Sequence, residues 1–132
     1  MSQANMDAAR TIYEHPKDRN IPFSIYDEEI DWDMMHYSGW LDQQTYVGDE
    51  GVKVFMRTWL GSFEKWEPVP ERFIESGDDV VVIVCDRAYL KGSSAPVTRR
   101  YAHVFTFRDD RVIRSRIYSD PAAALEAAGL SE

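Results

Sequence analysis

The fold of this chain is decided by residues 79–119, which read DVVVIVCDRAYLKGSSAPVTRRYAHVFTFRDDRVIRSRIYS. Three runs of apolar or alternating residues lie within this stretch, at 79–90, 97–107 and 112–119. Each run is separated from the next by a short segment rich in Gly, Ser or Asp, which is typical of antiparallel strands joined by tight turns. Residues 72–76 add a strand before the turn at Gly77. The sequence therefore predicts a meander of consecutive antiparallel strands.

Apolar residues recur at helical spacing on both sides of this meander. The clearest predicted helix carries one wide apolar stripe, with Asp49 as its N-cap and Pro68 beyond its end. The stripe consists of Val52, Phe55, Met56, Trp59, Leu60, Phe63 and Trp66. Shorter helices are predicted at 6–14, within 18–27 and at 120–129, and a further strand at 30–34. Helices segregated from consecutive antiparallel strands indicate the α+β class.

Size and charge limit the classes of function. A chain of 132 residues with 44% hydrophobic content fits one domain spanning residues 1–132. The net charge of −8 makes nucleic acid and an anionic membrane surface poor partners. The longest apolar run, residues 80–85, is too short to span a bilayer. Without a visible signal peptide, and with Cys85 as the only cysteine, the chain is expected in the cytoplasm.

Metal and cofactor sites are not expected. The three histidines, His15, His36 and His103, show no metal-ligand spacing with each other or with Cys85. The chain also lacks a Gly-rich phosphate loop and a nucleophile elbow.

The alternation of side chains along the last two strands brings polar groups together. Tyr101, His103 and Phe105 share one face of their strand, and Arg116 and Tyr118 share one face of the next. Burying ionisable groups costs several kcal/mol unless they are paired, so these faces either line a pocket or meet solvent. Periodicity alone leaves both orientations open.

The order of these segments resembles the SnoaL-like branch of the nuclear transport factor two superfamily over nearly the whole chain. The matching segments are Ile12–Tyr13, Ile30–Trp32, Tyr46–Val52 leading to Phe55 and Trp59, Ser76–Val82, Tyr101–Asp109, and Val112–Asp120 running into Ala124–Leu130. The resemblance implies a cone-shaped α+β domain. A curved mixed or antiparallel sheet would be wrapped by about three helices and a short C-terminal helix, and would enclose a pocket.

The resemblance also implies which side chains see the pocket. It turns His103 and Phe105 inward, together with Arg116, Tyr118 and Asp120 on the last strand. The expected pocket wall consists of Tyr13, Trp32, Trp59, Phe63, Phe105 and Arg116.

The implied reaction is proton abstraction next to a carbonyl of an apolar or aromatic, polyketide-like substrate, without a cofactor. Asp120 would be the base, and His103 and Tyr118 the hydrogen-bond donors. Asp120 also directly precedes Pro121, which favours a role as the N-cap of the terminal helix, and the two roles do not exclude each other. The alternative function is a non-catalytic ligand-binding domain of the same fold.

Three further expectations concern related activities and assembly. Trp32 occupies the place of the base in ketosteroid isomerases, which counts against that activity. Epoxide hydrolases of this superfamily need an Asp-Arg-Asp set, and this chain offers the residue types in Arg99, Arg116, Asp33 and Asp120 without a position-by-position match. A homodimer is expected through the outer sheet face, formed by Thr98, Ala102, Val104, Thr106, Ile113 and Ile117.

Overall fold

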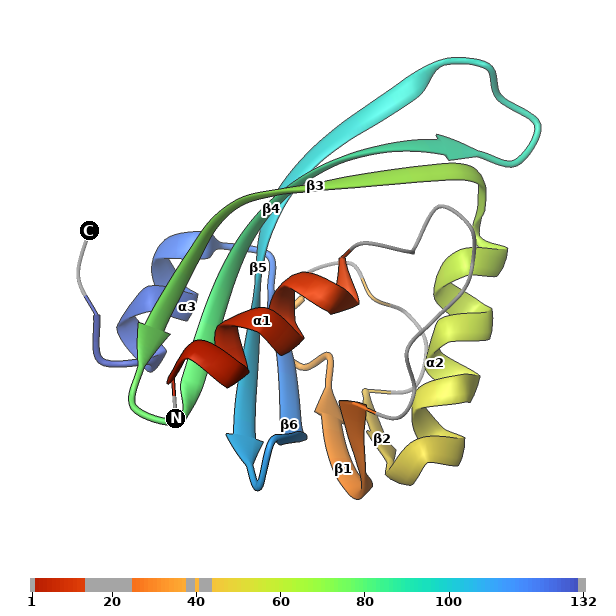
Figure 1. Ribbon diagram of the computed structural model, residues 1–132. Coiled ribbons are helices and arrows are strands. Elements are labelled where there is room, and N and C mark those ends of the chain that lie inside the picture. The colour runs from red at the N-terminus through yellow and green to blue at the C-terminus, as the bar shows by residue number, and fades with distance from the viewer. Residues whose placement is uncertain (1, 14–24, 38–39, 41–43, 131–132) are drawn as a thin grey trace.

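A computed structural model describes residues 2–13, 25–37, 40 and 44–130 (Figure 1). In chain order, its elements are α1 (Ser2–Ile12), β1 (Tyr26–Asp33), β2 (Thr45–Val47), α2 (Gly48–Gly61), β3 (Phe63–Ser76), β4 (Asp79–Leu90), β5 (Pro96–Arg108), β6 (Arg111–Tyr118) and α3 (Pro121–Ala127). Most of the helix predicted within 18–27 lies outside the described residues, and its last two residues begin β1.

The strands form one curved, unclosed mixed sheet. Their order is β2-β1-β6-β5-β4-β3, and β1 pairs with β6 in parallel while every other neighbouring pair is antiparallel. Figure 1 shows the long strands β3, β4 and β5 bending over together. The α+β prediction, with helices packed on a curved mixed sheet, is confirmed.

The boundary between α2 and β3 differs from the sequence prediction. The helix ends at Gly61, so Phe63 and Trp66 belong to β3 and not to the helix. Pro68, expected just beyond the end of the helix, lies within this strand, as does Pro70. β3 is an edge strand of the sheet. Proline, which has no N–H group, is tolerated there because one side of an edge strand has no neighbouring strand to accept a hydrogen bond.

The predicted helix caps have opposite outcomes. Val47 is the N-cap residue of α2, and Asp49 lies in the first turn, where its negative charge still suits the helix dipole. At α3, the Asp120 side chain accepts a hydrogen bond from the Ala122 N–H at 3.0 Å, which confirms Asp120 as the N-cap.

Apolar side chains pack on both faces of the sheet. On the concave face, α1 and α2 bury the larger core, which includes Ile12, Trp32, Phe55, Trp59 and Phe105. On the opposite face, α3 covers a smaller cluster of Val81, Ile83, Ala102, Val104, Tyr118, Ala124 and Leu125. None of the described helices is long and apolar enough to cross a membrane.

The pairing of β5 with β6 decides which side chains of β6 face the concave core. Residues directly opposite each other in antiparallel strands project to the same side of a sheet. His103 is paired with Ile117, and Phe105 with Ser115. The inward residues of β6 are therefore Ser115 and Ile117.

Candidate functional site

A cavity of about 30 Å³ lies between α1, α2 and the concave face of the sheet. Its wall is mostly aromatic and consists of Ile12, Tyr13, Tyr26, Phe55, Met56, Trp59, Trp66, Tyr101, His103 and Ile117. This volume exceeds what one ordered water requires. The cavity is therefore a small apolar space into which a few polar atoms project.

A chain of three polar side chains leads from the cavity wall into the core. The Tyr13 hydroxyl lies 3.0 Å from Nδ1 of His103, and Nε2 of His103 is hydrogen-bonded to the Ser115 hydroxyl. Rings hold the imidazole on both sides, since Phe105 stacks on it at 3.8 Å and Trp32 meets it edge-on at 5.2 Å between ring centroids. The imidazole orientation is thus fixed by both packing and hydrogen bonds.

Burial keeps these groups uncharged. It lowers the pKa of His103 to about 3, so that the ring is neutral at physiological pH. Burial also raises the pKa of Tyr13, Tyr26 and Tyr101 above the ordinary value for a phenol. Among the described residues, no group of three or more His, Cys, Asp or Glu side chains could hold a metal ion.

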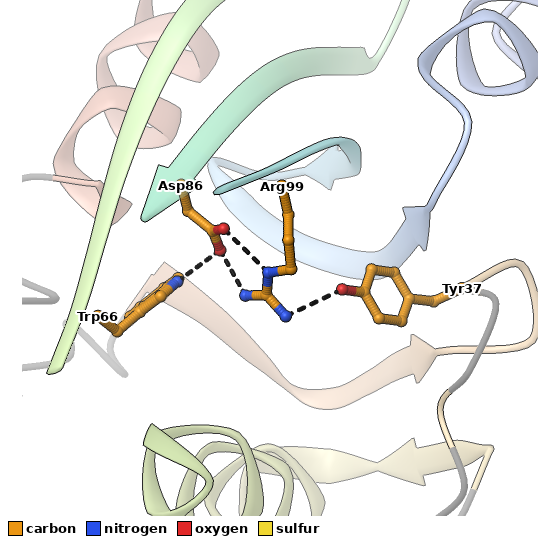
Figure 2. A network of polar contacts seen from close by, with 4 residues as sticks. All are labelled: Tyr37, Trp66, Asp86 and Arg99. Atoms are coloured by element: carbon orange, nitrogen blue, oxygen red, sulfur yellow. Dashed lines mark hydrogen bonds and ion pairs between the residues drawn. The ribbon is translucent and has the colours of Figure 1, made fainter. Parts of the chain in front are cut away.

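Next to the cavity, a buried ion pair joins β4 to β5. Asp86 and Arg99 are cross-strand partners, and the guanidinium donates from Nε at 3.0 Å and from Nη2 at 2.5 Å to the two carboxylate oxygens. Asp86 also accepts a hydrogen bond from the Trp66 indole at 2.7 Å, and Arg99 donates to the Tyr37 hydroxyl at 3.2 Å (Figure 2).

The same ion pair supports the aromatic wall of the cavity. The Arg99 guanidinium carbon lies 5.0 Å from the ring centre of Trp59 and 4.9 Å from that of Phe63, within the range of cation–π attraction. Trp59 and Trp66 both line the cavity. The Asp86–Arg99 pair therefore holds two side chains of the cavity wall, Trp59 and Trp66, in place.

Five of the predicted pocket and catalytic residues lie on the cavity side of the sheet. His103, Tyr13 and Trp59 line the cavity. Trp32 and Phe105 lie directly behind the wall, in contact with the His103 ring. Phe63 was also expected in the pocket wall. It packs against Trp59, with 5.7 Å between the ring centroids, but it does not line the cavity.

The expected inward orientation of Arg116, Tyr118 and Asp120 is wrong. Arg116 and Tyr118 are paired with Val104 and Ala102, so they project to the face that α3 covers. The Asp120 side chain is exposed and caps α3. The structure therefore does not bring Asp120 or Tyr118 to His103.

On their own face, these residues have other contacts. Arg116 donates to the Tyr118 hydroxyl at 3.4 Å and lies 3.8 Å from the Asp79 carboxylate. The Tyr118 ring stacks on His36 at 4.4 Å.

Part of the expected dimer interface is already covered within the molecule. Ala102 and Val104 are already buried beneath α3, and Ile117 lines the cavity, so these three are not on a free outer face. Arg99 pairs with Asp86, which is not among the four residues whose types were compared with the epoxide hydrolases.

Two important residues were missed in the sequence. Ser115 lies between isoleucines on the same side of the pleat, which marks a polar group on a buried face. Asp86 ends an apolar run and is fully buried, a pattern that indicates a paired carboxylate. Neither pattern identifies the partner, because the partner lies on another strand.

Replacing Asp120 separates its capping role from the catalytic role that the sequence suggested. We expect Asp120→Ala to lower the free energy of unfolding by about 1 kcal/mol, because the Ala122 N–H loses its acceptor. Ligand binding in the cavity should not change. Urea denaturation and a binding titration check both parts, and loss of binding in a folded variant would contradict this assignment.

A family model for the SnoaL-like domain matches residues 23–115 of the chain. Among solved structures, TerC co-crystallized with polyporic acid is 25% identical, with a TM-score of 0.78 over 96% of this chain and 98% of TerC. An NTF2-like protein of unknown function from Burkholderia pseudomallei is also 25% identical, with a TM-score of 0.79 over 96% and 97% of the two chains. A proposed SnoaL-like polyketide cyclase from Jannaschia sp. CCS1 is 19% identical, with a TM-score of 0.73 over 98% and 94%. No curated protein matches in sequence.

Proposed function

Because the chain belongs to the SnoaL-like domain family, we propose that it binds a small, uncharged aromatic compound in the cavity between α1, α2 and the sheet. The observation that carries this proposal is the Tyr13 hydroxyl on a mostly aromatic wall, hydrogen-bonded to a neutral and buried His103. Apolar cavities with few, well-placed polar groups are the usual form of small-molecule sites.

The charge of the wall supports an uncharged ligand. None of the residues that line the cavity carries a charge at neutral pH, given the neutral His103. The nearest ion pair, Asp86–Arg99, is satisfied internally. A charged ligand would therefore lose its hydration without gaining a counter-ion.

The size of the cavity limits the ligand to a single ring at most. At about 30 Å³ the cavity is narrow, so a ring must displace wall side chains as it enters. Met56 is the most adaptable of these, since its unbranched thioether repacks easily. The similar protein TerC was crystallised with the small ligand polyporic acid, which agrees with a ligand-binding role for this fold.

A second candidate is catalysis of proton transfer next to a carbonyl group in the same ligand. The hydrogen-bonded Tyr13 and His103 favour it, because a phenol held by a neutral imidazole could stabilise a developing enolate. Ligand binding remains the first proposal, because no carboxylate of the described residues lines the cavity to act as the base. Incorporation of deuterium into the methyl group of acetophenone in D2O tests the second candidate.

A titration of the protein with acetophenone, followed by calorimetry, tests the binding proposal. Replacing Ile117 with Phe fills part of the cavity, and we expect it to raise the dissociation constant at least about tenfold, or about 1.4 kcal/mol. Val69→Phe is the matched control, because Val69 is exposed on β3. Equal affinity for acetophenone in wild type and a folded Ile117→Phe variant would place the ligand elsewhere.

A further inference from the structure

Ser115 is a fully buried hydroxyl with one hydrogen-bond partner in the described part of the chain. Its relative exposure is 0%, and that partner is Nε2 of His103. A hydroxyl carries one proton, and a buried donor without an acceptor costs about 1–3 kcal/mol. If Ser115 accepted from Nε2, its own proton would be left without an acceptor. If Ser115 donates to Nε2 instead, the unpaired proton is that of Tyr13, which faces the cavity and not the closed core. The arrangement with the Ser115 hydroxyl donating to Nε2 therefore has the lower energy.

This direction determines the tautomer of His103. A neutral imidazole has one protonated nitrogen and one that accepts. If Nε2 accepts from Ser115, the proton is on Nδ1, and Nδ1 donates to the Tyr13 oxygen at 3.0 Å. The ring stays neutral because burial lowers its pKa to about 3. The chain of hydrogen bonds thus runs in one direction, from Ser115 through His103 to Tyr13.

The last proton in the chain is that of the Tyr13 hydroxyl. Nδ1 cannot accept it, because Nδ1 is itself the donor. His103 is the hydrogen-bond partner that the described residues provide for this hydroxyl, and Tyr13 lines the cavity. Because the described residues provide no other partner and Tyr13 lines the cavity, a molecule in the cavity can accept the Tyr13 proton.

We propose that Ser115 is a specificity-determining positioning residue, which sets the His103 tautomer so that Tyr13 donates a hydrogen bond to a carbonyl oxygen of the ligand. The inference rests on the proposed ligand-binding function and narrows it. A ligand with an acceptor and no donor, such as an aromatic ketone, accepts the hydrogen bond from Tyr13. A ligand with only a donor cannot accept it, and its own donor faces the Tyr13 proton. Ser115 acts through His103 and lies behind the cavity wall.

Nitrogen-15 NMR of His103 tests the direction of the chain without any ligand. In the wild type, we expect Nδ1 to have the chemical shift of a protonated nitrogen and Nε2 that of an unprotonated one. Ser115→Ala removes the donor to Nε2, and the ring should then populate the tautomer with the proton on Nε2. Ser115→Thr keeps the hydroxyl and should keep the wild-type tautomer. A wild-type spectrum with the proton on Nε2, or an unchanged tautomer in Ser115→Ala, would overturn the proposal.

Two probes of similar size, acetophenone and indole, test the consequence for binding. Acetophenone carries only an acceptor, and indole only an N–H donor. We expect the wild type to bind acetophenone about tenfold more tightly than indole, as one hydrogen bond predicts. Ser115→Ala should lose most of this preference, and Ser115→Thr should keep it. An unchanged preference in a folded Ser115→Ala variant would refute the role of Ser115 in specificity.

The two experiments separate this inference from the proposed function. If the wild type has the proton on Nδ1 and Ser115→Ala changes the tautomer, the role of Ser115 in directing the chain is supported whether or not acetophenone binds. Absence of acetophenone binding in that case contradicts the proposed ligand class alone.

Discussion

Asp86→Ala is expected to lower the free energy of unfolding by about 3 kcal/mol, because it leaves the Arg99 charge without its counter-ion in a partly buried site. The Asp86 side chain is 0% exposed, but that of Arg99 is 24% exposed. Water therefore compensates part of the loss, and the expected change lies at the low end of the roughly 3–5 kcal/mol typical of a broken buried ion pair. The Trp66 indole also loses its acceptor. Urea denaturation measures the change.

The chain provides a matched control for this prediction. Arg100 and Glu71 form an ion pair at 3.0 Å, with side chains that are 59% and 40% exposed. Glu71→Ala should cost about 0.5 kcal/mol or less, since surface pairs contribute little. If Asp86→Ala were no more destabilising than Glu71→Ala, the Asp86–Arg99 pair would not be what holds the cavity wall.

A strong dependence of stability on acid pH is expected from His103. Its pKa is about 3 in the folded protein and about 6.5 in an unfolded chain, so the unfolded state binds more protons between these values. Stability contributed by the neutral ring is fully present above pH 6.5 and is lost as the pH falls toward 3. Between pH 7 and pH 4.5, this single group should account for about 3 kcal/mol of lost unfolding free energy.

The variant His103→Gln isolates this contribution. Glutamine does not titrate, so the difference in stability between wild type and variant should shrink by about 3 kcal/mol between pH 7 and pH 4.5. His36→Gln, which replaces an exposed imidazole by the same amide, is the control for the substitution itself. Parallel slopes for wild type and His103→Gln would contradict a neutral, buried His103.

Much of the fold was predictable because its signals are local. The turns at 91–94 and 108–111 and the apolar runs between them correctly predicted β4, β5 and β6. The end of α2 was not predictable from periodicity, because Phe63 and Trp66 continue the helical stripe while lying in β3. Phe63 and Trp66 would pack against the same core in a helix or in a strand, so the apolar pattern does not distinguish these two conformations.

The site was predicted only on one of its two strands. The face of β5 that carries His103 and Phe105 was correct, but the face of β6 was reversed. The β6 sequence alternates arginines with isoleucines, so each face has both apolar and polar character, and only the register with β5 decides. Register depends on contacts between strands, which a single sequence does not display.

The missed Asp86–Arg99 pair has the same origin. Each residue taken alone is compatible with the surface, and the two are brought together only by cross-strand pairing. The predicted general base failed for a related reason, since Asp120 was judged by its type and not by the face from which it projects.

The most direct test of the account is a methyl-detected NMR titration with acetophenone. If the cavity is the binding site, the methyl signals of Ile12, Met56 and Ile117, which line it, should shift together and saturate. The methyl signals of Val104 and Leu125, on the opposite face of the sheet, should stay in place and serve as the internal control. Saturable shifts confined to Val104 and Leu125, or no shift of the three cavity methyl groups at saturating acetophenone, would contradict the claim that this cavity is the functional site.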